Sequence, residues 1–452
     1  MIGWRNLKRN KRRNLATGLA IVLSCAGLLL IGGHVLHTER YLRNVSIYLQ
    51  GVGHITIYKK EGREKHFVKP NRYSLSLEDQ EKIYKIALAD PNVELITKYL
   101  FASGLIGNGC ISVPFLGMGV IPEDEKKIRS NPNISAIAPD FFRMLKGKPL
   151  SEYPDFHEGI SIGFNLERRL HKSAVYEDPK SKQTQETLPS TTNSILDCSS
   201  SESTVQISKD PNVQLAAGTF DGSFSALDGE IVNTTFTGLE DREGDFLTAH
   251  LEHFQRLYDT DKVSYISIFL KNPDDIEREV LVWEKRFKDA GLDVSVYPWN
   301  SKHISPLYVG TTTFIRTLVT VIAFIFLIVV FLAIVNSTTI TVIERTREIG
   351  TLRSLGFTPK SIGMLFVAEN FVLSVISVVG GLILSVICAL FINVSNIRYQ
   401  SPGFTAHLQL ELITTWELVL CVVLMLFLVV SVTTFIVSTQ RAKRNIVALL
   451  TA

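Results

Sequence analysis

The sequence V-I-E-R-T-R-E-I-G-T-L-R-S-L-G-F at residues 342–357 separates two long apolar runs. The run before it, 318–343, contains no charged residue, and the run from 364 to 394 contains one, Glu369. About 20 apolar residues are enough to cross the hydrocarbon core of a bilayer at about 1.5 Å per residue. The sequence therefore predicts two membrane helices joined by a short polar segment.

The joining segment is rich in basic residues. Such residues are more frequent in cytoplasmic loops than in loops on the other side of the membrane. The segment is therefore expected to face the cytoplasm, where it could be an ordinary loop that only sets the topology. The basic residues of the segment are Arg345, Arg347 and Arg353, and Lys360 follows shortly after it.

Within this segment the apolar residues have helical spacing. Ile349, Leu352 and Leu355 follow one another at intervals of three residues, which places them on one stripe of a helix and leaves the charged residues elsewhere. Gly350 lies inside this helix, and Gly356, followed closely by a proline, is typical of a helix C-terminus. We expect a short amphipathic helix across the membrane surface, with Arg345, Arg347, Glu348 and Arg353 facing a polar partner.

The run E-R-T-R-E-I-G-T-L-R-S-L-G-F, with Ile362, Glu369 and the pair Gly380-Gly381 after it, resembles the signature of a family of ABC transporter permeases. This is the FtsX/MacB/LolC-LolE superfamily, which includes the permeases of lipoprotein-releasing systems. The resemblance implies that residues 344–357 are the coupling helix that contacts the ATPase subunit. The implied contact residues are Glu344, Arg345, Arg347, Glu348, Ile349, Gly350, Leu352, Arg353, Leu355 and Gly356.

Two further membrane helices are predicted near the ends of the chain. Six basic residues and no acidic one precede the apolar run 15–36, which is longer than the apolar core of a signal peptide and lacks a convincing cleavage site. We therefore expect a retained first helix with a cytoplasmic N-terminus. A fourth helix is expected at 416–437, followed by a basic C-terminus that is also cytoplasmic.

The 452-residue chain is only 46% hydrophobic, so a large polar domain must accompany the membrane helices. We expect this domain at residues 38–310, outside the cytoplasm, between a basic N-terminus with the first helix (1–37) and an FtsX-like permease domain (311–452). Alternating patterns predict strands at 54–58, 263–269 and 292–296. Mixed strands and helices indicate an α+β fold.

Two helices of this domain have clear sequence signals. Asp274 or Asp275 can cap a helix that buries Ile276, Val280, Trp283 and Phe287. A second helix is expected from residue 76 to 88, and its buried stripe is expected to consist of Leu77, Tyr84, Ala87 and Leu88. Residues 172–210 form a polar, variable insert. The pieces 119–125 and 218–228 resemble the MacB-like periplasmic core, the latter as a strand, turn and strand.

Five cysteines are present, of which Cys110 and Cys198 fall in the polar domain. In an oxidising compartment these two thiols could form a disulfide, or both could remain free. The cysteines and histidines show no metal-ligand spacing. The sequence also lacks a P-loop and a recognisable catalytic set, so we expect no enzymatic activity, metal or cofactor in this chain.

The resemblance implies a permease subunit of a type VII ABC transporter in the inner membrane. Two such permeases, identical or paralogous, would bind two copies of a separate ATPase subunit, and a periplasmic carrier or adaptor could also bind. The expected function is release or export of lipoproteins or other lipidated molecules by movement of the extracytoplasmic domain. The alternatives are an FtsX-like regulator of an extracytoplasmic partner, or MacB-like efflux with an adaptor. No nucleic-acid partner is expected.

Overall fold

The structure is a computed structural model that describes residues 11–132, 143–172, 175–176, 210–238, 244–273, 275–400, 405 and 407–443. The described chain divides into two compact units. One is helical and comprises residues 11–40, 311–398 and 409–443. The other is built around a β-sheet and comprises most of residues 41–310 and part of 399–408.

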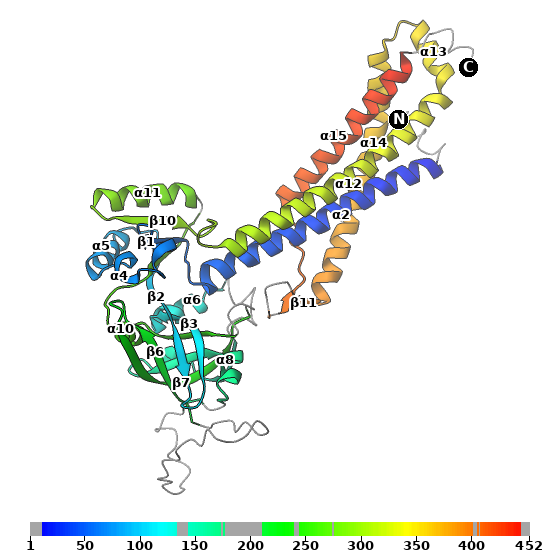
Figure 1. Cartoon of the computed structure of the whole chain (residues 1–452). Helices are drawn as coiled ribbons and strands as arrows, with labels where there is room; N and C mark the ends of the chain where they lie inside the picture. Colours follow the sequence, from blue (N-terminus) through cyan, green and yellow to red (C-terminus); the bar gives the residue numbers. More distant parts are fainter. Residues whose placement is uncertain are drawn as a thin grey trace. The chain divides into compact units, whose positions relative to one another are not determined.

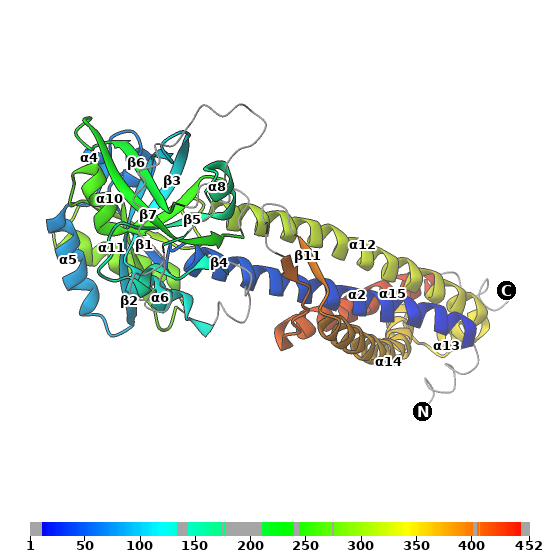
Figure 2. The ribbon, with the colours of Figure 1, turned by 90° about the horizontal axis from the view of Figure 1, so that it is seen from below.

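Four helices among the described residues are long and apolar enough to cross a membrane. Each extends beyond the range predicted from the sequence at one or both ends. The first runs to Asn44 and continues as a π-helical turn, η1 (Val45–Leu49). In Figures 1 and 2 the four helices run side by side. They are α2 (Lys11–Asn44), α12 (Pro306–Glu344), α14 (Pro359–Val394) and α15 (Trp416–Ala442).

The helices pack through small and polar residues as well as through apolar ones. A Cβ atom added to Gly381 in α14 would lie 2.6 Å from the Cβ atom of Cys25 in α2, so this glycine permits a close helix approach. Asn370 in α14 donates hydrogen bonds to the hydroxyls of Thr338 in α12 (3.1 Å) and Thr434 in α15 (3.0 Å). Gly381 is the second glycine of the Gly380-Gly381 pair that follows the joining segment.

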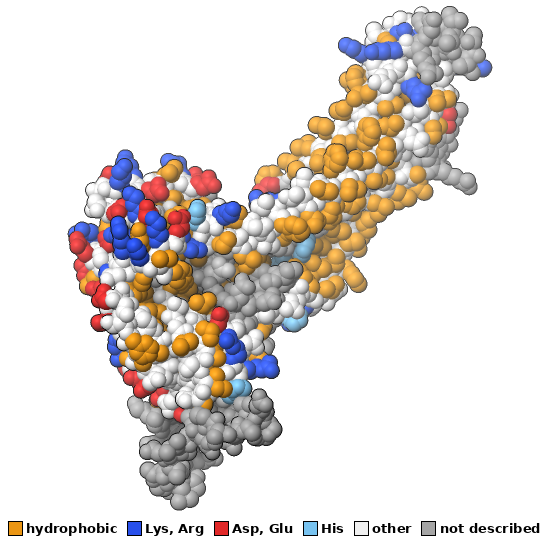
Figure 3. All heavy atoms as spheres, in the orientation of Figure 1, with side chains coloured by type: hydrophobic (Ala, Val, Ile, Leu, Met, Phe, Trp, Pro, Cys, Tyr) orange, Lys and Arg blue, Asp and Glu red, His pale blue; other side chains and the backbone are white. Residues whose placement is uncertain are grey.

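The outer surface of the helical unit is apolar. Figure 3 shows hydrophobic side chains over the visible face of the helices. On α12 the exposed residues include Phe324, Ile325, Ile328 and Leu332. Such a surface is suited to contact with lipid or with another apolar helix surface.

The second unit contains a ten-stranded mixed sheet. Its strands are β1 (Ile55–Lys59), β2 (Val93–Gly107), β3 (Ser112–Val120), β4 (Arg143–Gly147), β5 (Gly159–Gly163), β6 (Asn212–Gly218), β7 (Phe224–Phe236), β8 (Phe246–His250), β9 (Tyr265–Leu270) and β10 (Val294–Pro298). The strands predicted from alternation correspond to β1, β9 and β10, with shifted ends. β6 and β7 form the predicted strand, turn and strand.

Six of these strands close into a ring. β2 pairs with β3, β3 with β8, β8 with β5, β5 with β7, β7 with β6, and β6 returns to β2. The β3–β8 and β5–β7 pairs are parallel, while the other four are antiparallel. Inward side chains such as Leu215, Ile231 and Leu247 are fully buried. This ring supplies much of the core of the unit.

The predicted helix after Asp275 is confirmed as α11 (Ile276–Asp289). The Asp275 side chain accepts a hydrogen bond from the Arg278 backbone N–H, and all four predicted apolar residues are buried. Asp274 lies outside the described residues. The remaining helices are α3 (Gly62–Lys65), α4 (Pro70–Tyr73), α5 (Leu77–Leu88), α6 (Pro122–Arg129), η2 (Leu150–Glu152), α8 (Phe164–Arg169) and α10 (Leu251–Tyr258).

The buried stripe predicted for α5 is wrong in part. Its N-cap is Ser76, in a capping box with Asp79, but the residues that it buries are Gln80, Ile83 and Ala87. Leu77 and Leu88, both predicted to be buried, are 46% and 71% exposed. The polar Gln80 can occupy the buried face because its amide donates hydrogen bonds to the backbone carbonyls of residues 75 and 261.

Cys110 is disulfide-bonded in the structure. Its predicted partner, Cys198, lies outside the described residues, as does most of the polar insert 172–210. The pairing of the two cysteines therefore stays a prediction.

Candidate functional site

The segment between α12 and α14 folds as a separate short helix, α13 (Thr346–Ser354). Arg345 interrupts the helical path with a φ of −106° and a ψ of 21°. The Thr346 hydroxyl donates hydrogen bonds to the carbonyls of Val342 (3.1 Å) and Ile343 (2.7 Å), which satisfies acceptors at the end of α12. The predicted short helix is thus present within the expected residues.

α13 ends just before Gly356, the glycine that the sequence predicted at its C-terminus. Gly356 has a φ of +93°, a conformation that glycine adopts without the strain caused by a Cβ atom. The backbone N–H of Phe357 donates to the carbonyl of Leu352, and that of Gly356 donates to Arg353, both at 3.1 Å. These two bonds form a Schellman motif, which closes the helix. Next, Thr358 caps α14, whose first residue is Pro359.

α13 packs on the helical unit through a small apolar cluster. Ile349 is 2% exposed and packs with Val342, Ile362, Phe366 and Ala442, which come from α12, α14 and α15. Leu352 is partly buried against the same cluster. Leu355, the third residue of the predicted stripe, is 72% exposed, because the helix ends at Ser354 and Leu355 is its C-cap. The predicted stripe is therefore wrong at this position.

Arg345 makes contacts within the chain, contrary to the expectation that it faces a partner. Its Nε atom lies 2.6 Å from a carboxylate oxygen of Glu348, and its Nη1 atom lies 2.8 Å from one of Glu369 in α14. Its guanidinium also lies 5.4 Å from the ring centroid of Phe366. Although partial burial opposes the charged form, the two carboxylates raise the pKa of Arg345. Arg345 therefore ties α13 to α14.

The rest of the segment presents a mixed surface. Arg347 is exposed and has no ion-pair or hydrogen-bond partner among the described side chains. Arg353 is half-buried, and its Nε atom is buried without a hydrogen-bond partner in the described part of the chain. Phe357 is 49% exposed. Its position beside Leu355 gives this end of α13 two exposed apolar side chains.

Glu344 is exposed, Gly350 is buried within α13, and Gly356 is exposed beyond its end. All ten residues predicted as ATPase contacts therefore lie on one short segment. Ile349 and Gly350 are buried and Arg345 pairs within the chain, whereas Arg347 and Leu355 are exposed.

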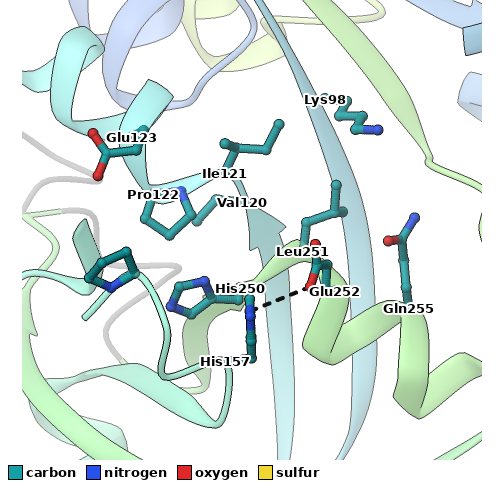
Figure 4. Close-up of a pocket in the computed structure, with 11 residues that line it drawn as sticks. Lys98, Val120, Ile121, Pro122, Glu123, His157, His250, Leu251, Glu252 and Gln255 are labelled. Atoms are coloured by element: carbon teal, nitrogen blue, oxygen red, sulfur yellow. Dashed lines mark ion pairs between the residues drawn. The ribbon is translucent and has the colours of Figure 1, made fainter. Parts of the chain in front are cut away.

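A cavity of about 320 Å³ lies in the sheet unit, where β3 and β8 end (Figure 4). The rings of His157 and His250 lie edge to face, with centroids 5.3 Å apart and an interplanar angle of 74°, and the Nδ1 atom of His157 lies 3.4 Å from a carboxylate oxygen of Glu252. Burial, with the nearby His157, lowers the pKa of His250 to about 4. Burial, with the charge of Arg256, similarly lowers the pKa of His253 to about 4.

Sequence reasoning missed this cavity, because its histidines come from segments about 90 residues apart in the chain. Among the described residues, no three His, Cys, Asp or Glu side chains come together in a way that could hold a metal ion. The described lining also contains no serine, threonine or cysteine that could act as a nucleophile. The cavity can hydrogen-bond a polar ligand, but it offers no evident reaction.

Comparisons with known proteins identify the helical unit. Residues 320–446 match the family described as FtsX-like permease C-terminal. An uncharacterized ABC transporter permease of Methanocaldococcus jannaschii is 26% identical over 184 residues, which are 41% of this chain and 45% of that protein. This chain thus spans less than half the length of that relative in the match. The family match at residues 320–446 includes α13, all of α14 and the part of α12 from residue 320 onward.

Two solved structures match about half of this chain. The periplasmic region of MacB from Actinobacillus actinomycetemcomitans is 10% identical, with a TM-score of 0.32, and the match covers 56% of this chain and 92% of that one. The extracellular domain of the ABC-type transporter YknZ from Gram-positive bacteria is 10% identical, with a TM-score of 0.30, covering 54% of this chain and 98% of that one.

The four apolar helices and the matched segment define a helical membrane protein. The chain contains an FtsX-like permease segment and is a homologue of ABC transporter permeases, in agreement with the resemblance seen in its sequence. The subtype that releases lipoproteins stays a prediction.

Proposed function

We propose that this chain is the non-catalytic permease subunit of a type VII ABC transporter, and that α13 is the docking element for a separate ATPase subunit. The observation that carries this proposal is a folded helix inside the FtsX-like segment, tied at Arg345 to α14 and ending in exposed apolar side chains. Movement of a partner bound there would act directly on α12 and α14. The sheet unit would perform the mechanical work.

The docking surface consists of the exposed residues of the segment. Leu355 and Phe357 provide apolar contacts, and Arg347 provides an unpaired positive charge. Apolar side chains at the centre of an interface commonly dominate its affinity, while charges at the rim set orientation and association rate. Arg345, Ile349 and Gly350 instead hold α13 in place. In this proposal two permeases, identical or paralogous, bind two ATPase copies.

Photocrosslinking tests the docking surface. A benzoylphenylalanine at Leu355 should capture the ATPase subunit in the native membrane. The control is the same residue at Leu88 on the surface of α5, which is almost equally exposed, at 71% against 72%. Capture at neither position, or at both, would remove the support for α13 as the docking element.

The orientation that we propose places both termini in the cytoplasm, with the sheet unit outside the cytoplasm and the helices in the inner membrane. Six basic residues precede Leu15, while Arg398 is the one Lys or Arg residue of the loop 394–413. Reporter fusions at Lys172 and at the C-terminus should therefore report opposite sides of the membrane. Fusions that report the same side would contradict this topology.

The substrate that we favour is a lipoprotein or another lipidated molecule released from the outer leaflet, with a periplasmic carrier or adaptor as a further partner. The large sheet unit between α2 and α12 in the chain favours a transport role over simple signalling. The alternatives are activation of an extracytoplasmic partner and MacB-like efflux. Purification of the native complex distinguishes them, since each requires a different extracytoplasmic protein to be retained.

A further inference from the structure

A second cavity in the sheet unit, of about 340 Å³, lies where the chain leaves the first membrane helix. It is formed by residues at the end of α2, in η1, just before β1, in β2 and β9, and at the start of α11. A cavity of this size is sufficient for a small polar ligand. The lining residues that bear on its chemistry are Arg43, Tyr48, His54, Glu94, Lys271 and Trp299.

His54 offers a hydrogen-bond donor to this cavity. The residue is 4% exposed, and its Nδ1 atom accepts a hydrogen bond of 2.9 Å from the backbone N–H of Leu270. Burial, with the charge of Arg43, lowers the pKa of His54 to about 4, so the ring is neutral at pH 7. Because Nδ1 is the acceptor, the single ring proton is on Nε2. That N–H has no hydrogen-bond partner among the described residues.

Arg43 and Glu94 carry opposite charges on the wall of this cavity but do not pair with each other. Both side chains are exposed, and neither has a hydrogen-bond or ion-pair partner in the described part of the chain. Lys271 is different, because its Nζ atom already donates to the carbonyl of Pro91 at 2.9 Å. The cavity thus offers one unpaired cation, one unpaired anion and one unpaired N–H. A ligand with both charges could satisfy all three.

The place of Arg43 in the chain indicates the source of such a ligand. Arg43 lies seven residues after Leu36, where the predicted apolar run ends, on the same continuous helix. Seven residues of α-helix correspond to about 10 Å, whereas the polar headgroup region extends about 5–8 Å beyond the hydrocarbon core on each side. The backbone of Arg43 therefore lies at the outer boundary of this region, and the long side chain can reach into it. Tyr48 and Trp299, which also line the cavity, are residue types enriched at that depth.

We propose that this cavity binds the zwitterionic headgroup of an aminophospholipid, with the phosphate held by Arg43 and the Nε2–H of His54, and the ammonium group held by Glu94. A phosphodiester accepts hydrogen bonds from a guanidinium and an imidazole N–H, and a primary ammonium group donates to a carboxylate. The site would hold the sheet unit to the lipid surface. It does not depend on the proposed ATPase partner.

The test is lipid binding to the full-length chain, purified in detergent and measured by native mass spectrometry. Dihexanoyl phosphatidylethanolamine should bind at a single saturable site, at least about tenfold more tightly than dihexanoyl phosphatidylglycerol, which lacks the ammonium group. Arg43→Gln should weaken binding of the ethanolamine lipid about tenfold. Glu94→Gln should remove the preference between the two lipids. Both side chains are exposed, so the variants should fold.

Lys60→Gln is the matched control, because Lys60 is an exposed cation of the same unit that pairs with Asp293 at 3.5 Å. This variant should bind the ethanolamine lipid as the wild type does. Equal binding of the two lipids, or no effect of Arg43→Gln and Glu94→Gln, would overturn the proposal. Inorganic phosphate or glycine that competes as strongly as the short-chain lipid would also overturn it, since either would identify a free anion or amino acid as the ligand.

Discussion

Arg345 joins two helices, α13 and α14, through one guanidinium. It forms ion pairs with Glu348 in α13 and Glu369 in α14. The side chain of Arg345 is 24% exposed, and that of Glu369 is 20% exposed. Arg345→Ala should lower the free energy of unfolding of the helical unit by about 1–3 kcal/mol, since it leaves Glu369 without its cation. Arg347→Ala, which removes an exposed and unpaired arginine, should change it by less than about 0.5 kcal/mol.

Thermal unfolding of the detergent-solubilised chain measures this difference. Replacing Glu369 by alanine in the Arg345→Ala background removes the unpaired carboxylate, so the double variant should recover part of the lost stability. Equal unfolding temperatures for Arg345→Ala and Arg347→Ala would show that the two ion pairs contribute nothing measurable to the position of α13.

His250 and His253 should make the sheet unit sensitive to mild acid. Their pKa values fall from 6.5 to about 4 on folding, so between these pH values the unfolded chain binds more protons than the folded chain. Stability is therefore complete above about pH 6.5 and decreases as the pH falls to 4, by at most about 3 kcal/mol for each residue. The two contributions are not additive, because both rings lie near His157.

The measurement is the unfolding temperature between pH 7.5 and 4.5. His253→Gln should flatten this dependence, whereas His407→Gln, which changes an exposed histidine, should leave the slope as in the wild type. A wild-type slope in His253→Gln would mean that other groups cause the acid sensitivity.

At the scale of elements, the contact between α2 and α14 depends on one glycine of a pair. A Cβ atom at Gly381 would lie 2.6 Å from Cys25, whereas one at Gly380 would meet only a side-chain atom of Val22 at 3.4 Å. Gly381→Val should therefore cost about 1–3 kcal/mol through overpacking, and Gly380→Val should cost less than about 1 kcal/mol. The intrinsic helix propensity changes equally in both variants. Thermal unfolding of the two proteins in the same detergent tests this, and equal losses would contradict the close approach of α2 and α14.

Local sequence signals predicted several elements well. α11 was predictable because its cap and its buried stripe, including Trp283, all lie within one short segment. α13 was predictable from its spacing and from the glycine at its end. The prediction failed at Leu355, where the helix ends one residue before the stripe does, and at Gln80, whose burial depends on carbonyls that a local pattern does not reveal.

At the scale of the whole molecule, the ring of strands could not be predicted from the sequence. Its parallel pairs join β3 to β8 and β5 to β7, and each pair brings together segments that are separated by at least about 70 residues. Both cavities also depend on such distant segments: His157 meets His250 in one, and Arg43 meets His54, Glu94 and Trp299 in the other. Residue spacing along the chain does not predict these contacts, because they are set by the tertiary fold.

In the function that we propose, α13 transmits movement of the bound ATPase subunit into the helical unit. If so, the exposed apolar pair at its end should matter more to coupling than to folding. Leu355→Asp with Phe357→Asp changes two side chains that are 72% and 49% exposed, so the variant should insert and unfold as the wild type does. Placing charges in an apolar interface should weaken docking of the ATPase by at least about tenfold.

The most direct measurement is ATP turnover by the reconstituted complex in lipid nanodiscs, with permease and ATPase at fixed concentrations. The doubly substituted permease should lose most of the turnover that the wild-type permease stimulates. Leu88→Asp, on an equally exposed leucine of α5, should retain it. Wild-type stimulation by the α13 variant would contradict the assignment of α13 as the coupling element.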